Sequence, residues 1–396
     1  MRISMYNNID LHWWGNDLLL IRNICEYYFF EEEEVFFVEH LCKTNKVADL
    51  VYNITRELDV DSITVESFID IFMENFADYF YFTHEETTQL IGISGKRSAY
   101  YPLEIHISLT NRCVQNCKHC YKSAGAYGVF INSHMLAAFL DHMAGYVPYI
   151  CLSGGEPTLH PDFSKIMGRY SSTYDICVLS SGVRVLPLLG VIAKAKRGMI
   201  VSIYSSIPSV HDEFAGYKGS YAEVLKSIDA AKANDIPVSI TTLISKDNFK
   251  DIERLVELMN QKEIGIINIG RISSIGRAKE SNLEAMKSIP DSLQEDLLGL
   301  KTRHSNVEIL SDTECGNALL PFSPLKCSAG TLSWSINEYG QIHPCGVCSV
   351  EELSLGVIDG FDESILINRT PYIEKVNKVH LIKHMQETGA VCPFHE

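Results

Sequence analysis

The stretch LEIHISLTNRCVQNCKHCYK, residues 103–122, decides the fold of this chain. Its apolar start, 103–109, predicts a strand, and three cysteines with the spacing C-x3-C-x2-C follow directly. Five more β-rich apolar runs come after it, at 148–153, 175–181, 198–204, 237–244 and 264–272. Helical patterns separate them, at about 133–145, 161–171, 184–196, 219–234 and 247–262. This alternation predicts a parallel α/β array, and six strands suit an open three-quarter barrel better than a closed eight-stranded one.

Polar motifs are expected at the carboxyl ends of such strands, where active sites of these folds lie. Cys113, Cys117 and Cys120 follow the first strand. Three thiolates on one loop can bind three irons of a cubane cluster and leave the fourth iron open to a small chelating ligand. Spacing alone leaves two alternatives, a zinc knuckle, which wants four ligands, and incidental cysteines.

Three further strand ends carry small polar residues. The second strand ends in Ser153-Gly154-Gly155-Glu156-Pro157, where glycines allow close approach of a ligand and Glu156 can accept from an ammonium group. Ser180-Ser181-Gly182 follows the third strand, and Ser202 ends the fourth. Together they suit a ribose and an amino-acid head group, although a lone Gly-Gly is also common in an ordinary strand-to-helix turn.

These motifs resemble those of the radical S-adenosylmethionine (SAM) superfamily. His119 stands at the aromatic position of that family's cysteine signature, and 154–157 matches its GGEP motif, which contacts the methionine amino group. Ser180 and Ser202 match the ribose-side and fourth-strand positions. The segment 202–221 and Gly276-Arg277-Ala278 resemble the peptide-modifying branch. The resemblance implies a partial (βα)6 TIM-type barrel over 103–305 that binds SAM and a [4Fe-4S] cluster.

The C-terminal part, 306–396, carries a second group of cysteines. Cys327-x12-Gly340-x4-Cys345 is similar to the start of a SPASM or twitch extension, and 336–343 predicts a hairpin that turns at 338–340. With Cys348 and Cys392, four ligands are available for one auxiliary iron–sulfur cluster, expected to be [4Fe-4S], which is the shorter twitch form. Cys315 is a fifth candidate, as a ligand, a free thiol or a structural residue. Cys25, Cys42, Cys151 and Cys177 are expected in the core.

The N-terminal part is unlike the rest in composition. Residues 1–86 hold five Lys or Arg against eighteen Asp or Glu, a charge of −13 within a total of −16, and many aromatic residues. Strands are expected at 18–22, 27–30 and 79–82 and helices at 34–42, 47–58 and 65–76, a small winged-helix-like domain over 1–90 with a linker at 91–102. It resembles a recognition element for ribosomally synthesised and post-translationally modified peptides (RiPPs), which adds a leader peptide to a sheet edge, here 18–22. A dimerisation or packing module is the alternative.

Composition excludes several other classes. The negative charge argues against nucleic-acid binding, and no apolar run approaches the roughly 20 residues of a membrane span. The first residues lack the cationic start and apolar core of a signal peptide. We therefore expect a cytoplasmic chain whose twelve cysteines are reduced thiols and metal ligands.

The order of the three parts resembles RiPP maturases, including those that form sactipeptide and ranthipeptide thioethers. The resemblance implies a 5′-deoxyadenosyl radical that takes hydrogen from Cα or Cβ of a precursor peptide, whose cysteine sulfur then captures the carbon. It also implies an external one-electron donor such as flavodoxin or ferredoxin. Carbon–carbon or carbon–oxygen crosslinking, epimerisation and a non-catalytic iron–sulfur protein that delivers a peptide remain as alternatives.

Overall fold

The computed structural model describes residues 1–22, 26–85, 90–245, 248–272, 275–280, 293–311, 328–349 and 351–378. The chain divides into two compact units, Met1–Tyr101 and Pro102–Glu396, which are described separately below. No helix in the described ranges is long and apolar enough to cross a membrane.

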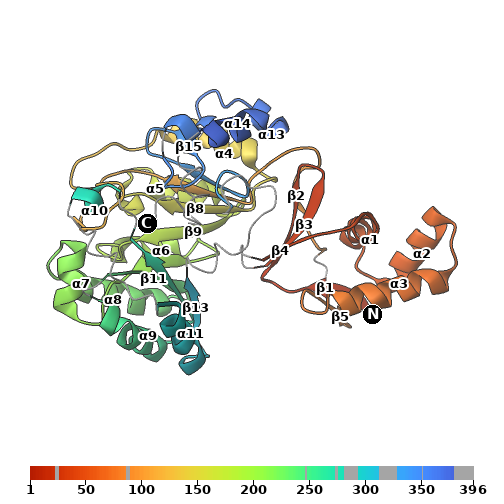
Figure 1. Cartoon of the computed structure of the whole chain (residues 1–396), viewed down its shortest axis with the longest axis horizontal. Coiled ribbons are helices and arrows are strands. Elements are labelled where there is room, and N and C mark those ends of the chain that lie inside the picture. The colour runs from red at the N-terminus through yellow and green to blue at the C-terminus, as the bar shows by residue number, and fades with distance from the viewer. Residues whose placement is uncertain are drawn as a thin grey trace. The chain divides into compact units, whose positions relative to one another are not determined.

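The N-terminal unit combines a small sheet with three helices (Figure 1). Its strands and helices are, in chain order, β1 (Arg2–Met5), β2 (Ile9–Trp14), β3 (Asp17–Arg22), β4 (Glu26–Phe29), α1 (Glu32–Lys43), α2 (Val47–Leu58), α3 (Ser62–Asn75), β5 (Phe80–Thr83) and β6 (Ser94–Gly95). One sheet has the order β4-β3-β2-β6, and β1 pairs with β5.

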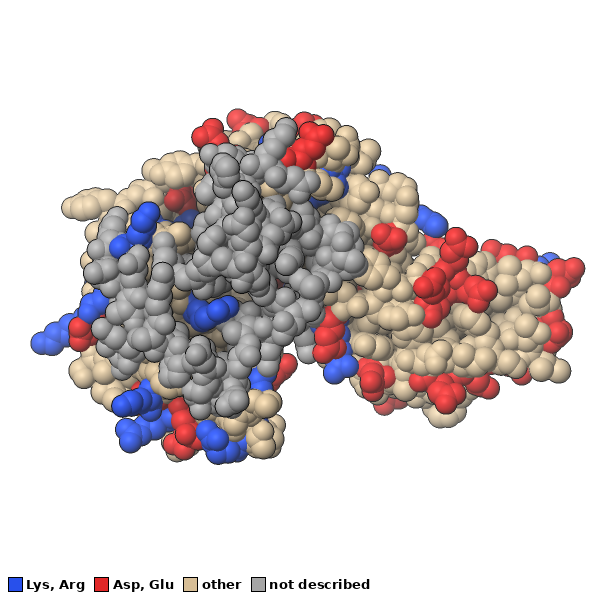
Figure 2. Space-filling model, viewed as in Figure 1, with Lys and Arg blue, Asp and Glu red and all other residues tan. Residues whose placement is uncertain are grey.

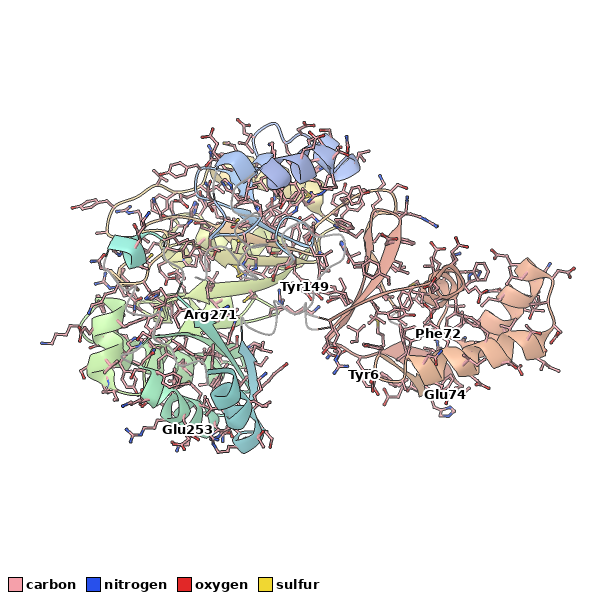
Figure 3. All side chains as sticks on the ribbon, viewed as in Figure 1. Tyr6, Phe72, Glu74, Tyr149, Glu253 and Arg271 are labelled. Atoms are coloured by element: carbon pink, nitrogen blue, oxygen red, sulfur yellow. The ribbon has the colours of Figure 1, made fainter. Side chains whose placement is uncertain are left out.

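Aromatic packing holds this unit together. The ring of Phe72 on α3 lies 4.6 Å from those of Phe37 and Phe76 and 5.4 Å from that of Phe80, so one side chain joins α1, α3 and β5 (Figure 3). Aromatic pairs at these separations add to the free energy gained by burial alone. On the face shown in Figure 2, acidic side chains outnumber basic ones over the helices of this unit.

The structure confirms the predicted strands at 18–22 and 27–30 and the three helices, and corrects three details. The sequence reading missed β1 and β2, and β3 lies inside the sheet between β2 and β4. The expected docking edge at 18–22 is therefore wrong, because both sides of β3 are already paired. The expected linker is also part of this unit, since β6 pairs with β2 and Ala99 and Tyr101 are buried.

The second unit is built on one ten-stranded sheet. From edge to edge its strands are β13 (Glu308–Ser311), β12 (Ile266–Arg271), β11 (Val238–Ile244), β10 (Met199–Ser202), β9 (Asp175–Ser180), β8 (Tyr149–Ser153), β7 (Glu104–Ser108), β14 (Ser333–Ile336), β15 (Gln341–His343) and β16 (Gly356–Val357). All six predicted barrel strands, β7 to β12, are present, parallel and in chain order. The polar motifs therefore meet at one end of the sheet.

Helical segments alternate with these strands (Figure 1). They are α4 (Ser133–Met143), η1 (Pro157–Leu159), α5 (Phe163–Tyr170), η2 (Leu186–Leu188), α6 (Leu189–Ile192), α7 (Pro208–Ala215), α8 (Ser220–Lys232), η3 (Phe249–Asp251), α9 (Ile252–Gln261), α10 (Arg277–Glu280) and α11 (Leu293–Arg303). The helix predicted at 184–196 is mostly irregular, because Pro187 lies within it and only η2 and α6 form.

The C-terminal residues continue the same sheet. The predicted hairpin forms from β14 and β15, with Gly340 at φ +78° in its turn, and β14 runs parallel to β7. η5 (Glu351–Leu353), α13 (Ser364–Ile367) and α14 (Thr370–Lys378) follow. Because β13 joins β12 and β14 joins β7, the described strands after residue 305 share one sheet with the predicted barrel, and they belong to the same compact unit as that barrel.

Candidate active site

The three motif cysteines lie on the loop that follows β7. Cys113 and Cys117 are buried, and Cys120 is half-buried. Backbone N–H groups already point at two of the sulfurs, since Gln115 N donates to Cys113 Sγ at 3.4 Å and Ala124 N to Cys120 Sγ at 3.3 Å. Such donors stabilise a metal-bound thiolate and tune the potential of a cluster.

Burial keeps two of these thiols protonated without metal. It raises the pKa of Cys113 to about 11 and, together with repulsion from the neighbouring cysteines, that of Cys117 to about 12. In the described ranges no three His, Cys, Asp or Glu side chains converge as ligands of one ion. The three cysteines nevertheless suit a cubane, because each thiolate binds a different iron there.

The two glycines of the second motif pack against the cysteine loop. A Cβ at Gly154, which has φ +141°, would lie 2.3 Å from Thr110 O, and one at Gly155 would lie 2.2 Å from Arg112 O. Gly155 N and Glu156 N donate to these same carbonyls, at 2.7 and 2.8 Å. A side chain at either position would clash with the cysteine loop, so the packing of the loop already requires glycine here. The sequence had suggested only that these glycines make room for a ligand.

Glu156 has a different position from the one expected. Its buried carboxylate accepts from Ser180 Oγ, from the N–H and Oγ of Ser181, and from Thr158. Glu156 does not line the cavity beside the cysteines, nor does Pro157, which is buried at the start of η1. In this structure Glu156 ties the end of β8 to the end of β9, and a contact with SAM remains a prediction.

One cavity of about 340 Å³ collects most of the other predicted residues. The predicted site residues that line it are Cys113, Cys117, His119, Cys120, Gly154, Gly155, Ser180 and Ser202. Further lining residues that the sequence did not assign include Tyr204, Thr241, Asn268 and Arg277. Residues on six neighbouring strands, β7 to β12, or on the segments that follow them thus surround one space beside the three thiols.

Arg277 is the most informative of the residues that were missed. Its Nε donates to Cys117 O at 2.8 Å, and its backbone N donates to Cys120 O at 3.1 Å. A Cβ at Gly276, φ +56°, would lie 2.5 Å from Cys120 O. The motif 276–278 therefore clamps the cysteine loop and brings a guanidinium to the cavity. The sequence feature that could have identified Arg277 is the position of this motif directly after the sixth strand.

Two histidines, one on the cysteine loop and one on α7, take part in packing around that loop. His119 stacks on Phe214, with ring centroids 4.7 Å apart, and burial together with Arg277 lowers its pKa to about 3. His211 is buried, accepts from Tyr204 N at 3.1 Å, and bonds Ser220 Oγ at 2.9 Å, while Gln115 Nε2 donates to the same hydroxyl. The resemblance noted across 202–221 thus corresponds to a network that reaches the cysteine loop.

The second group of cysteines is described only in part. Cys348 N donates to Cys345 Sγ at 3.3 Å, and hydrogen bonding from Cys348 lowers the pKa of Cys345. The other predicted ligands, Cys327 and Cys392, lie outside the described residues, as does Cys315.

A buried ion pair connects this region to the first loop. Lys122 Nζ lies 2.9 Å from Glu338 Oε2 in the β14–β15 turn, and both side chains are about one-tenth exposed. Ser108 Oγ at the end of β7 also donates to Glu338, at 3.0 Å. The hairpin is thereby joined both to the cysteine loop and to the first barrel strand.

The sequence is similar to a known protein family and to several characterised proteins. Residues 107–259 match the Radical SAM superfamily. The sporulation killing factor maturation protein SkfB of Bacillus subtilis (strain 168) is 27% identical over 280 residues, 68% of this chain and 66% of that protein. An AdoMet-dependent heme synthase of Methanosarcina barkeri (strain Fusaro / DSM 804) is 29% identical over 191 residues, 46% of this chain and 54% of its own length. Both matches span less than two thirds of the relative.

The fold is similar to that of a solved structure. Streptococcus suis SuiB bound to precursor peptide SuiA has a TM-score of 0.63 at 15% identity, covering 94% of this chain and 90% of SuiB. At this identity the likeness concerns the fold alone. The sequence match carries the assignment: residues 107–259, which supply most of the residues that line the cavity, form a radical SAM domain.

Proposed function

We propose that this chain is a radical SAM enzyme that modifies a ribosomally synthesised precursor peptide, most specifically by forming a thioether from a cysteine sulfur to Cα or Cβ. The observation that carries the proposal is the single cavity in which the three cysteines meet Gly154, Gly155, Ser180 and Ser202. When bound, SAM and a [4Fe-4S] cluster would supply a 5′-deoxyadenosyl radical that abstracts hydrogen from the peptide. The chain's residues orient these groups and exclude water.

Each part of the cavity has a role in binding the cofactors. Cys113, Cys117 and Cys120 would hold the cluster, with backbone N–H groups at two sulfurs. The strand ends at Ser180 and Ser202 suit the ribose. The guanidinium of Arg277 is a cationic group beside the thiols and would neutralise part of the negative charge that builds up when the thiolates form.

A peptide substrate agrees with the nature of the relatives and with the N-terminal unit. SkfB is named as a maturation protein, and SuiB is solved with a precursor peptide, with likeness over 94% of this chain. In the described part of the unit, β4 pairs only with β3, so its other side can take a leader strand. An acidic run, 31–34, follows β4 directly and favours a basic leader.

The second cysteine group supports electron removal after the carbon radical forms. Cys345 and Cys348, with Cys327 and Cys392, would hold the auxiliary cluster, and four ligands would leave it without an open iron. When the carbon radical bonds to the thiol sulfur, one electron and one proton are released, and a second redox centre would accept that electron. Electron transfer is the role we assign to it, with flavodoxin or ferredoxin as the external donor.

The test is anaerobic reconstitution with iron and sulfide, followed by incubation with SAM, a reductant and candidate precursor peptides. We expect 5′-deoxyadenosine and a peptide that has lost two hydrogen atoms, with the linkage located by fragmentation. A product of unchanged mass would indicate epimerisation, and a linkage between carbons or to oxygen would identify another crosslink. Because one relative is a heme synthase, the same assay is also run with a tetrapyrrole in place of the peptide. Turnover of the tetrapyrrole without turnover of any peptide would contradict the peptide proposal.

A further inference from the structure

A second hollow, of about 590 Å³, lies against the cysteine loop and opens to solvent. It shares only Cys113 and Gln115 with the inner cavity. Its other lining residues follow three neighbouring strands, with Arg112 after β7, Leu159 after β8 and Arg184 after β9. Leu159 and Arg184 are exposed, whereas Cys113 is buried. One of the three motif cysteines therefore lies at the base of a surface hollow.

Cys113 is the motif cysteine that belongs to both spaces. Cys117 and Cys120 line the inner cavity and not the hollow. When SAM and a peptide fill the cavity, as proposed above, an electron from an external donor has to arrive from another side. Because the rate of electron transfer falls steeply with distance, the hollow offers a short route to a cluster held by these cysteines.

Two guanidinium groups without an acidic partner line the hollow. Within the described ranges neither Arg112 nor Arg184 lies within ion-pair distance of a carboxylate, whereas Arg169, Arg197 and Arg303 each pair with one. Since residues 1–86 carry most of the negative charge, the remainder of the chain is close to neutral. The two arginines therefore make the hollow a locally positive surface.

Arg112 is held in place before any partner arrives. Its Nε donates to Ala126 O at 3.3 Å, and its Cζ lies 5.2 Å from the ring centroid of Phe130. A guanidinium that is already fixed loses little side-chain entropy when it meets an anionic group. A carboxylate oxygen of Glu223 accepts from the backbone N of Arg184 at 3.2 Å, and Glu223 forms no ion pair with that residue's guanidinium.

Apolar side chains complete the lining of the hollow. They are Val114, Ala126, Phe130 and Leu159. Arginine beside aromatic and aliphatic groups is a composition typical of protein interfaces. Complexes that transfer electrons bury small interfaces, so a hollow of this size is sufficient to centre one. The hollow thus suits a protein with an acidic surface.

We propose that the hollow with Arg112 and Arg184 on its wall and Cys113 at its base is the docking surface for an acidic protein that carries a one-electron cofactor. After docking, the carrier is oxidised by one electron, and the cluster that Cys113, Cys117 and Cys120 would hold is reduced by one electron. No bond forms or breaks in this step, and no proton is transferred. The inference rests on the proposed function, which requires an external donor, and adds to it the place where that donor binds.

The first test measures the affinity of oxidised flavodoxin, an acidic flavin protein, for the reconstituted full chain by calorimetry at low and at high salt. Arg184→Asn removes one charge at a residue with φ +60°, a conformation that Asn tolerates. We expect the affinity to fall about fivefold at low salt. At high salt the difference from wild type should shrink, because salt screens exposed charges.

Two further variants make the measurement specific. Asn116→Asp adds a carboxylate of nearly the same shape at an exposed residue that lines the hollow, and it should lower the affinity by a similar factor. Lys194→Asn is the matched control. Lys194 is exposed and precedes β10, whereas Arg184 follows β9, so the two residues lie at opposite ends of the parallel sheet. Lys194→Asn should bind flavodoxin as wild type does.

A kinetic comparison separates docking from cofactor binding. Peptide-free formation of 5′-deoxyadenosine is measured with reduced flavodoxin below saturation and, separately, with reduced methyl viologen, a small cation that needs no docking surface. In Arg184→Asn we expect the flavodoxin-supported rate to fall about fivefold and the viologen-supported rate to stay at the wild-type value.

Flavodoxin affinity that is unchanged in both Arg184→Asn and Asn116→Asp would overturn the proposal. An equal fall of the viologen-supported rate in Arg184→Asn would also overturn it, since Arg184 would then act on the cofactor site. So would a loss of precursor-peptide affinity without a loss of flavodoxin affinity, which would make the hollow a peptide-binding surface. Wild-type protein that cleaves no SAM with either donor would overturn the proposed function. The flavodoxin titration needs no turnover and still decides the present proposal in that case.

Discussion

Ser180 Oγ lies 3.0 and 2.9 Å from the two carboxylate oxygens of Glu156 and joins the end of β9 to the turn after β8. Ser181 N and Oγ donate to the same carboxylate at 2.9 and 2.7 Å. The residues expected to face the cofactor separately thus form one buried network. The backbone of Glu156 also donates to Arg112 O, so the same residue contacts both the cysteine loop and the end of β9.

Glu156→Gln is expected to destabilise the second unit and weaken SAM binding. The amide retains one oxygen but turns an NH2 group toward hydrogen-bond donors, which leaves buried groups unsatisfied at a cost of about 2 kcal/mol. Denaturant unfolding and SAM titration measure the two effects. Glu257→Gln, at an exposed side chain of α9, is the control. Full stability and SAM affinity in Glu156→Gln would show that the network has no such role.

Replacing Cys113, Cys117 and Cys120 together by Ala should abolish 5′-deoxyadenosine formation. All three thiols line the cavity that also contains Ser180 and Ser202. The cavity has one more cysteine, Cys151, which lies within β8 and not on the loop. Iron content and electron paramagnetic resonance should show loss of one cluster and retention of the proposed auxiliary one. Cys42→Ala, in the N-terminal unit, is the matched control. Continued SAM cleavage by the triple variant would refute the assignment of the loop.

The Lys122–Glu338 pair should matter more to stability than exposed pairs do. Lys122→Met leaves a buried carboxylate without its partner, at a cost of about 3 kcal/mol. The double variant Lys122→Met/Glu338→Met should recover much of that loss, because no charge then remains buried. Lys165→Met, which breaks an exposed pair with Asp162, should change stability by less than about 1 kcal/mol. Equal effects of the two single lysine variants would contradict this account.

The N-terminal unit should lose stability in acid through His12. Burial lowers the pKa of His12 to about 4, and its Nε2 bonds Tyr101 O at 2.9 Å. As pH falls from about 6.5 to about 4, His12 binds a proton in the unfolded state but not in the folded state. The free energy of unfolding therefore falls by about 3 kcal/mol in total. Unfolding followed by Trp13 and Trp14 fluorescence at pH 7 and 4.5 measures the loss.

His12→Gln should show a smaller difference between the two pH values than wild type, and His84→Gln, at an exposed histidine, should behave as wild type. An identical pH dependence in His12→Gln would mean that other groups cause the acid effect.

Removal of residues 1–101 should weaken precursor binding and stop modification, with peptide-independent SAM cleavage retained. These residues form one compact unit, whereas the cavity with the cysteines belongs entirely to the second. Because residues 1–86 carry a charge of −13, binding of a basic leader to the full chain should also weaken as salt rises. Precursor affinity that does not change on truncation would leave the unit with a packing or dimerisation role.

The sequence by itself determined the features that are local along the chain. The six barrel strands, the three N-terminal helices and the β14–β15 hairpin follow from apolar periodicity and turn residues, which depend on near neighbours only. The spacing of Cys113, Cys117 and Cys120 is equally local. Periodicity gave no sign of β1 or β2, since β2 is buried along nearly its whole length and lacks a clear alternation.

Only the tertiary structure decided which distant groups meet. It placed β3 inside its sheet, turned Glu156 toward Ser180 and Ser181, packed Gly154 and Gly155 against the cysteine loop, and paired Lys122 with Glu338. The physical reason is that a buried donor or charge must find a partner wherever the folded topology supplies one. That partner depends on strand order and on the approach of loops far apart in the chain, neither of which residue spacing encodes.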